Sequence, residues 1–136
     1  MTTPLDQVRW IDLPSTKDTR GVLTAVESGR DVPFEIRRVF YMHGISAPRG
    51  GHAHRDTEQI LMAVAGSFRA EVFDGTRSEV HVLDDATRGL YLPAMVLVEM
   101  TDFSPGAVGL VLASTHYDKR RSIRSREEFL AALEAP

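Results

Sequence analysis

The chain has 136 residues, of which 43% are hydrophobic and 26% charged, a formal net charge of −3 and no cysteine. This length fits one domain, which we expect to occupy residues 1–136, and the lack of cysteine excludes disulfides and thiolate chemistry. The small net charge provides no general attraction to nucleic acid or membranes, and no apolar run is long enough to span a bilayer. The first residues show no signal-peptide pattern, so we expect a cytoplasmic protein without nucleic-acid or membrane partners.

Short apolar or alternating runs recur along the chain between turn-forming residues, which is typical of β-strands. Strands are predicted at 8–13, 21–27, 34–42, 59–65, 68–73, 79–83, 89–92, 96–101 and 107–113. Asp74-Gly75 between two of these runs is a strong hairpin signal, because Asp-Gly suits the positive φ angles of a tight turn. Many short strands at this spacing favour an all-β sandwich or barrel over about residues 8–114.

Only the end of the chain has a helical pattern. Ser125 followed by Glu128 is a capping box, and an apolar stripe continues from it through Phe129, Leu130 and Leu133. We therefore predict a short helix at about 125–133 that packs over one end of the β-structure. The basic run before it, 119–126, has no interleaved aromatic residues, so it is interpreted as a solvated face and not as a nucleic-acid patch.

Two histidines one residue apart, His52 and His54, follow the Gly50-Gly51 turn. Side chains of an extended segment alternate between its faces, so these two imidazoles point to the same side. Histidine titrates near neutrality, which makes such a pair suitable for proton transfer in a pocket, although the rings could also only satisfy hydrogen bonds in a strand. The other three histidines are expected to be structural or on the surface, with one of them, His81, on an exposed strand face.

This His-x-His layout resembles the first motif of the cupin barrels, which implies a cupin-type jelly roll. Cupin metal sites usually combine three histidines with a carboxylate. Here Val98 stands where the third histidine is expected, and either Glu58 or Gln59 stands in the carboxylate register. Two imidazoles and at most one carboxylate make a poor transition-metal site, so we expect no metal.

Arginines near this motif are candidates for binding an anion. Arg38 falls within the apolar phase of the strand predicted at 34–42, and a buried guanidinium needs an anionic partner, either a carboxylate of this chain or a ligand phosphate. Arg49 and Arg69 are further candidates for gripping phosphate. Tyr41 lies in the opposite phase from Arg38, so both can face the pocket only if the strand bulges.

Several motifs in a fixed order extend the resemblance over about residues 11–133. They are 20–27, 33–41, 48–55, 58–59, 66–69, 89–91, 99–104 and 112–114. Together they resemble the sugar 3,4-ketoisomerases that act on dTDP-4-keto-6-deoxyglucose, a cupin family related to the WxcM C-terminal domain. The resemblance implies a metal-free isomerase, without a cofactor, that moves a carbonyl from C4 to C3 of the nucleotide-linked sugar.

The same resemblance implies roles for particular residues. His52 and His54 are the expected catalytic pair, and Tyr41 the expected donor to the enediolate oxygen. Which histidine acts on carbon, which nucleotide base is bound and whether the new C4 hydroxyl is axial or equatorial all stay open. The residues expected to bind the substrate are Arg38, Arg49, Gln59 and Arg69. The family also implies a homodimer that exchanges N-terminal strands, which fits the segment 8–13.

One departure from the family concerns two adjacent positions. Related sequences commonly carry Trp-His where this chain has Leu97-Val98. If that aromatic ring stacks on the substrate and that histidine lines the pocket, this chain lacks both contacts. This departure favours, as an alternative function, a non-catalytic module that binds a nucleotide sugar. A metal-dependent cupin oxygenase or epimerase is a further alternative.

Overall fold

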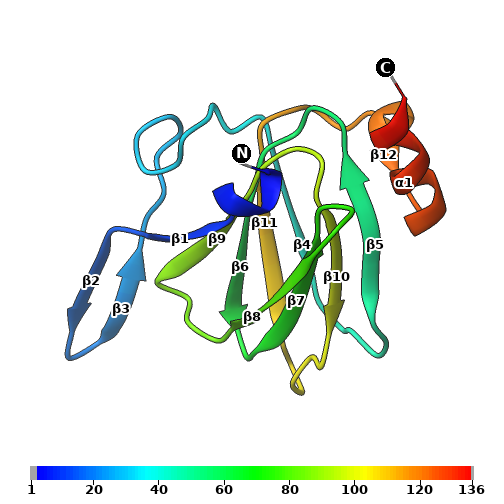
Figure 1. Cartoon of the computed structure of the whole chain (residues 1–136). Coiled ribbons are helices and arrows are strands. Elements are labelled where there is room, and N and C mark those ends of the chain that lie inside the picture. Colours follow the sequence, from blue (N-terminus) through cyan, green and yellow to red (C-terminus); the bar gives the residue numbers. More distant parts are fainter. Residues whose placement is uncertain (1–2, 136) are drawn as a thin grey trace.

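Two five-stranded antiparallel sheets face each other in the computed structural model, which describes residues 3–135 (Figure 1). The first sheet has the order β1 (Arg9–Asp12), β9 (Arg88–Leu92), β6 (Gln59–Ala65), β11 (Val108–Ala113) and β4 (Arg38–Met42). The second has the order β12 (Ser122–Ile123), β5 (Arg49–His54), β10 (Leu97–Thr101), β7 (Phe68–Phe73) and β8 (Ser78–Leu83). This arrangement confirms the predicted all-β jelly roll.

Three smaller pieces complete the chain. A separate hairpin of β2 (Ser15–Asp18) and β3 (Gly21–Thr24) projects from the sandwich (Figure 1). Short 3₁₀ helices span Pro4–Gln7 and Lys119–Arg121, and the helix α1 spans Arg126–Glu134. The predicted limits of the domain include residues 1, 2 and 136, which lie outside the described part of the chain. Within residues 3–135, no helix is long and apolar enough to cross a membrane.

The main core fills the space between the sheets. Alternate residues of β6, β7 and β9 point into it, among them Leu61, Phe68, Val72 and Leu90, each at most 2% exposed. Burying side chains of this size provides about 1.5–3 kcal/mol each. The hairpin predicted at Asp74-Gly75 is confirmed, since the Asp74 carboxylate accepts backbone N–H bonds from inside the turn between β7 and β8.

The strand predicted at 34–42 is shorter than expected. Only its end, β4, pairs in the sheet, and the residues before it cross the outer face of the first sheet. There Val32 and Phe34 cover Ile60 of β6 and Leu112 of β11. Phe34 is apolar because it covers this second core, and not because it belongs to a strand. Its apolar character therefore extended the predicted strand beyond the observed one. The hairpin strand β2 was missed because all four of its residues are exposed.

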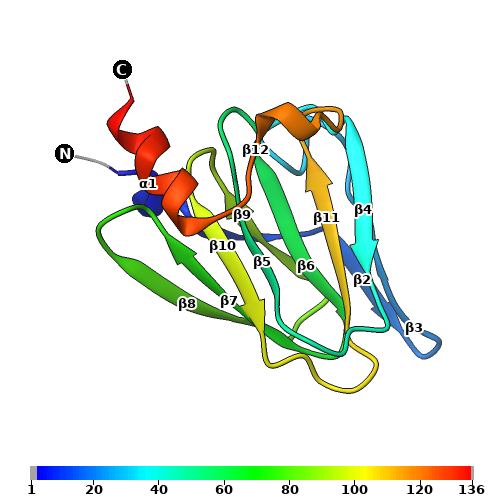
Figure 2. The same ribbon diagram turned by 90° about the vertical axis from the view of Figure 1, so that its right-hand side faces the viewer.

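The C-terminal helix packs on the outer face of the second sheet (Figure 2). Ser125 Oγ accepts the Glu128 N–H at 3.1 Å, as the capping box predicts, while the Glu128 carboxylate accepts the N–H of Arg124 and not that of the cap residue. Phe129, fully buried, contacts a cluster that includes Leu97 of β10. The helix therefore supports the sheet that carries the histidines. The prediction of a short C-terminal helix is confirmed, whereas its expected place over one end of the β-structure is corrected to the outer face of this sheet.

Candidate active site

A cavity of about 310 Å³ lies inside the sandwich and is lined by residues of both sheets, including β4 and β5. This volume is at the lower end of the range of small-molecule sites. The residues that line it are Phe40, Tyr41, Met42, His43, Arg49, Gly50, His52, His54, Gln59, Leu61, Leu92, Val98, Met100 and Val111. Much of its wall is apolar, and its polar side chains come from the end of β4, from β5 and from the start of β6.

His52 and His54 both line this cavity, as their spacing predicts, while Ala53 between them is buried on the other face of β5. The approach to the pair needs Gly50, whose φ is 107° and where a Cβ atom would lie 2.5 Å from the Val98 carbonyl oxygen. Beyond the pair, the His54 carbonyl accepts the Met95 N–H at 2.8 Å. The strand that carries the two rings is thus fixed at both ends.

Burial and neighbouring arginines keep both imidazoles neutral. Burial, followed by the charge of Arg38, lowers the pKa of His54 to about 4. Burial also lowers the pKa of His52, and the charges of Arg124 and Arg49 lower it further. Neutral rings can accept a proton at neutral pH, so the pair is poised for base chemistry.

The choice between Glu58 and Gln59 is decided by the phase of β6. Gln59 lines the cavity, whereas the Glu58 carboxylate accepts a hydrogen bond from Tyr91 Oη at 2.6 Å and does not line it. Burial and this bond raise the pKa of Tyr91. The cavity therefore offers two imidazoles and an amide, and the 3–135 segment holds no cluster of three His, Cys, Asp or Glu side chains with metal-binding geometry. This donor set does not fit a cupin metal centre.

Arg38 lies at the upper end of β4 beside His54. Its side chain is half-buried, and its Nε atom is buried without a hydrogen-bond partner. Throughout residues 3–135, no carboxylate oxygen lies within 4 Å of its guanidinium. The rings of Phe40 and Tyr117 flank it, at 5.3 and 5.5 Å from the ring centroids. Of the two partners considered for Arg38, a carboxylate of this chain is therefore not the one present.

The other predicted site residues lie farther from the histidines. Tyr41 is 63% exposed, because β4 runs without a bulge and keeps Tyr41 out of phase with Arg38. Its ring lies 5.6 Å from the ring of His43, tilted by 31°. Arg49 is exposed at the cavity's lower margin. Arg69 is on the outer face of β7, paired with Asp102 at 3.4 Å, and lines neither this cavity nor the hollow next to it. The structure therefore brings all of the predicted set except Arg69 to the cavity or its margins.

Leu97 and Val98, where the chain departs from the family, lie on opposite faces of β10. Leu97 is 2% exposed and packs in the cluster beneath α1, whereas Val98 lines the cavity opposite His52. A change at position 97 thus alters packing under the helix, and only the change at 98 alters the cavity wall. Of the two positions, therefore, only 98 contributes a side chain to the cavity.

Sequence reasoning missed two residues in the hollow next to the cavity and misplaced a third. Tyr117 and Arg124 come close to the histidines from the segment before α1, which carried no strand pattern long enough to predict. His81 was expected on an exposed face, but its ring lies inward, 6.1 Å from the Trp10 ring and hydrogen-bonded to Glu79 at 3.2 Å.

Comparison with known proteins agrees with this geometry. The family model described as FdtA: WxcM-like, C-terminal, matches residues 6–134. A TDP-4-oxo-6-deoxy-alpha-D-glucose-3,4-oxoisomerase of Aneurinibacillus thermoaerophilus is 41% identical over 114 residues, which cover 82% of each chain. The sugar 3,4-ketoisomerase QdtA of Thermoanaerobacterium thermosaccharolyticum, solved with TDP, superposes with a TM-score of 0.91 at 34% identity over 94% of this chain and 95% of its own. WlaRB of Campylobacter jejuni, a TDP-quinovose 3,4-ketoisomerase, gives 0.86 at 40% identity over 92% and 98%.

The fold and the paired histidines thus define a cupin-type isomerase. The chain belongs to the FdtA, WxcM-like C-terminal family. The predicted family, fold class and 3,4-ketoisomerase function are confirmed by these comparisons.

Proposed function

We propose that this chain moves the carbonyl of a TDP-linked 4-keto-6-deoxyglucose from C4 to C3, in deoxyamino-sugar biosynthesis, with His52 and His54 as the catalytic pair. The relative from Aneurinibacillus is named for this isomerisation. The observation that supports the proposal most is that two neutral imidazoles share one face of β5 in a cavity much of whose wall is apolar.

The reaction needs only proton transfers. The C4 ketone makes the C3 proton acidic, and its removal by a histidine leaves an enediolate. A proton passes from the C3 oxygen to the C4 oxygen, and a proton returned to C4 completes a hydroxyl there and a carbonyl at C3. The electrons are redistributed within the sugar, so no redox cofactor takes part. The Gln59 amide can donate a hydrogen bond to the enediolate oxygen, where negative charge develops.

We assign the removal of the C3 proton to His52. A general base is most effective when its pKa lies close to the working pH. The pKa of His54 falls to about 4, which makes it the weaker base, and its ring is the more buried of the two. His54 then stays neutral through the cycle and serves the enediolate as a hydrogen-bonding group.

The proposed chemistry uses no metal. Support comes from the donor set, since Val98 replaces a third imidazole and the Glu58 carboxylate is bonded to Tyr91. Arg38 and Arg49 are proposed to bind the substrate's negative charge, whereas Arg69, paired with Asp102, takes no part. Tyr41, at the margin, is proposed to contact the substrate only where it leaves the cavity.

The test is incubation with TDP-4-keto-6-deoxyglucose in heavy water, followed by NMR of the sugar. An isomerase incorporates deuterium at C3 or C4 and forms the 3-keto product, whereas a non-catalytic binder leaves both carbons unlabelled. His52→Asn and His54→Asn should each abolish labelling while the protein stays folded. Full activity in both variants would refute the assignment.

We also propose that the protein works as a homodimer that exchanges its N-terminal region. In the single chain β1 pairs with its own β9, so the hairpin of β2 and β3 is the better candidate for exchange than residues 8–13. It projects from the sandwich with Val22 and Leu23 exposed, at 53% and 67%. Leu23→Glu should convert a dimer to a monomer in analytical ultracentrifugation, and a monomeric parent protein would contradict the proposal. The cytoplasmic location stays a prediction.

A further inference from the structure

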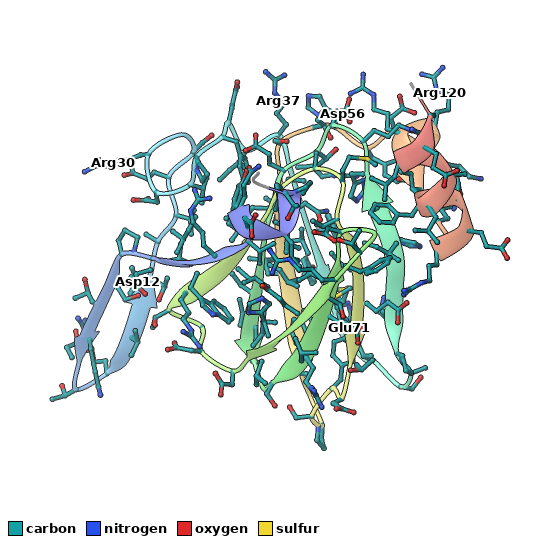
Figure 3. All side chains as sticks on the ribbon, in the orientation of Figure 1. Asp12, Arg30, Arg37, Asp56, Glu71 and Arg120 are labelled. Carbon is teal, nitrogen blue, oxygen red and sulfur yellow. The ribbon has the colours of Figure 1, made fainter. Side chains whose placement is uncertain are left out.

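The connection from β5 to β6 links the two histidines to a polar group of the facing sheet. It crosses from the second sheet to the first at the upper end of the sandwich, where Asp56 pairs with Arg121 at 2.8 Å (Figure 3). Among the described residues, Gln59 at the start of β6 is the only polar side chain that β6, β9 and β11 contribute to the cavity wall. The way in which β6 begins therefore decides which polar group faces the histidines.

Glu58, the residue before Gln59, is held by three hydrogen bonds. Its N–H donates to Ser114 Oγ at 2.8 Å, and its carbonyl accepts the Ser114 N–H at 3.0 Å. Its carboxylate accepts the hydrogen bond from Tyr91 Oη, at 2.6 Å. Ser114 directly follows β11 and Tyr91 is in β9, and these are the two strands that pair with β6. Glu58 is therefore fixed to the neighbours on both sides of its own strand.

The bond between Tyr91 and Glu58 lies on the outer face of the first sheet. Tyr91 is 5% exposed and belongs to the second apolar cluster, together with Ile60, which is opposite it on β6. Burial, followed by the bond to Glu58, raises the pKa of Tyr91, so the hydroxyl keeps the proton that it donates. Neither side chain lines the cavity, so any effect of this pair on the reaction passes through the backbone of β6.

The pair controls the phase of β6. For packing alone, an apolar pair of similar volume would serve as well, because a buried polar group stabilises a core little even when it is paired. With Glu58 on the outer face, Gln59 points inward, since successive side chains of a strand point to opposite faces. A slip by one residue would instead turn the Glu58 carboxylate toward the histidines. A carboxylate there would repel the negative charge of the enediolate, whereas the neutral amide can donate to it.

We propose that Tyr91 and Ser114 are positioning residues for the isomerisation: they hold Glu58 on the outer face and thereby orient the Gln59 amide toward the substrate. This rests on the proposed function, which places the enediolate between the histidines and Gln59. The amide is needed most when negative charge develops on the oxygen, so loss of its orientation lowers kcat more than it changes KM.

The test is steady-state kinetics of the isomerisation, with the 3-keto product followed by NMR. Tyr91→Phe removes only the hydroxyl and should lower kcat about tenfold to a hundredfold, as expected when a group of the active site is displaced by about 1 Å, while KM stays within about twofold of the parent value. Ser114→Ala removes the acceptor of the Glu58 N–H and should change kcat in the same direction.

The matched control is Thr87→Val. Thr87 Oγ1 also donates to a carboxylate at 2.6 Å, that of Asp85, but it does so in the turn before β9 and does not line the cavity. Its loss removes a bond of the same kind and length, so kcat and KM should both keep their parent values.

Three comparisons separate positioning from a general folding defect. Glu58→Gln keeps an oxygen that accepts from Tyr91 Oη, so it should retain more activity than Glu58→Ala. In a Gln59→Ala background, Tyr91→Phe should lower kcat by less than about twofold further, because the group that it positions is already absent. Gln59→Glu should be less active than Gln59→Ala, since its carboxylate opposes the enediolate.

An unchanged kcat in Tyr91→Phe would overturn the proposal. An equal loss of kcat in the parent and Gln59→Ala backgrounds would also overturn it, because Tyr91 would then act on stability alone. A Gln59→Glu variant as active as the parent would do the same. Failure of the proposed function would show separately, as a parent protein that forms no 3-keto product and takes up no deuterium.

Discussion

Acidification should destabilise this protein through His54 in particular. An unfolded chain holds a histidine at its ordinary pKa of 6.5, whereas burial and Arg38 lower the pKa of His54 to about 4 in the folded state. Between these values the unfolded state binds more protons, so the free energy of unfolding decreases as the pH falls from about 6.5 toward 4. Proton linkage gives a loss of about 2.5 kcal/mol at pH 4.5, and screening by water in the open cavity reduces the expected loss to about 2 kcal/mol.

The assay is urea unfolding of the parent protein and of His54→Asn at pH 7 and pH 4.5. The carboxylates titrate in both proteins, so the difference between their pH dependences isolates His54. The variant should lose about 2 kcal/mol less than the parent on acidification. The matched control variant is His116→Asn, which removes an exposed imidazole that does not line the cavity. The reasoning would be refuted if the parent and His54→Asn lost the same free energy of unfolding between pH 7 and pH 4.5, to within about 0.5 kcal/mol.

Three further predictions concern packing and the cavity wall. Phe129→Ala should cost about 3–5 kcal/mol in urea unfolding, because the fully buried ring is removed from beneath the helix; a cost below 1 kcal/mol would contradict the packing. Val98→His should add a third imidazole to His52 and His54 and increase zinc affinity at least about tenfold by titration, and an unchanged affinity would show that position 98 does not face the pair. Gly50→Ala should lower the thermal midpoint, since its Cβ atom has no room beside a carbonyl oxygen, so an unchanged midpoint would be the contrary result.

Much of the architecture follows from local patterns. Alternation and apolar runs predicted all strands of the two sheets except β5 and β12. Ser125 and Glu128 predicted the start of the helix, and the spacing of His52 and His54 predicted that both rings share a face. Each of these signals is carried by residues within a few positions of one another, because strand and helix periods are properties of the local backbone. The family resemblance then connected the His-x-His motif to sugar isomerisation.

Other features depend on pairing between distant segments. The sequence could not tell that Phe34 leaves the strand to cover the sheet, because an apolar residue looks the same in a strand and in a lid. It could not separate Leu97 under the helix from Val98 at the cavity, since the faces of β10 are fixed by its partners. Nor could it foresee the inward position of His81, whose ring contacts Trp10 from another sheet.

The position of Arg124 shows the same limit most clearly. The sequence by itself determined two imidazoles on one face and an arginine, Arg38, in an apolar phase. Only the tertiary structure placed Arg124 beside His52, about seventy residues away along the chain, because it directly follows β12, which pairs with β5. The physical reason is that two residues of strand carry no readable period, and their position is decided by the backbone hydrogen bonds that a distant strand edge offers.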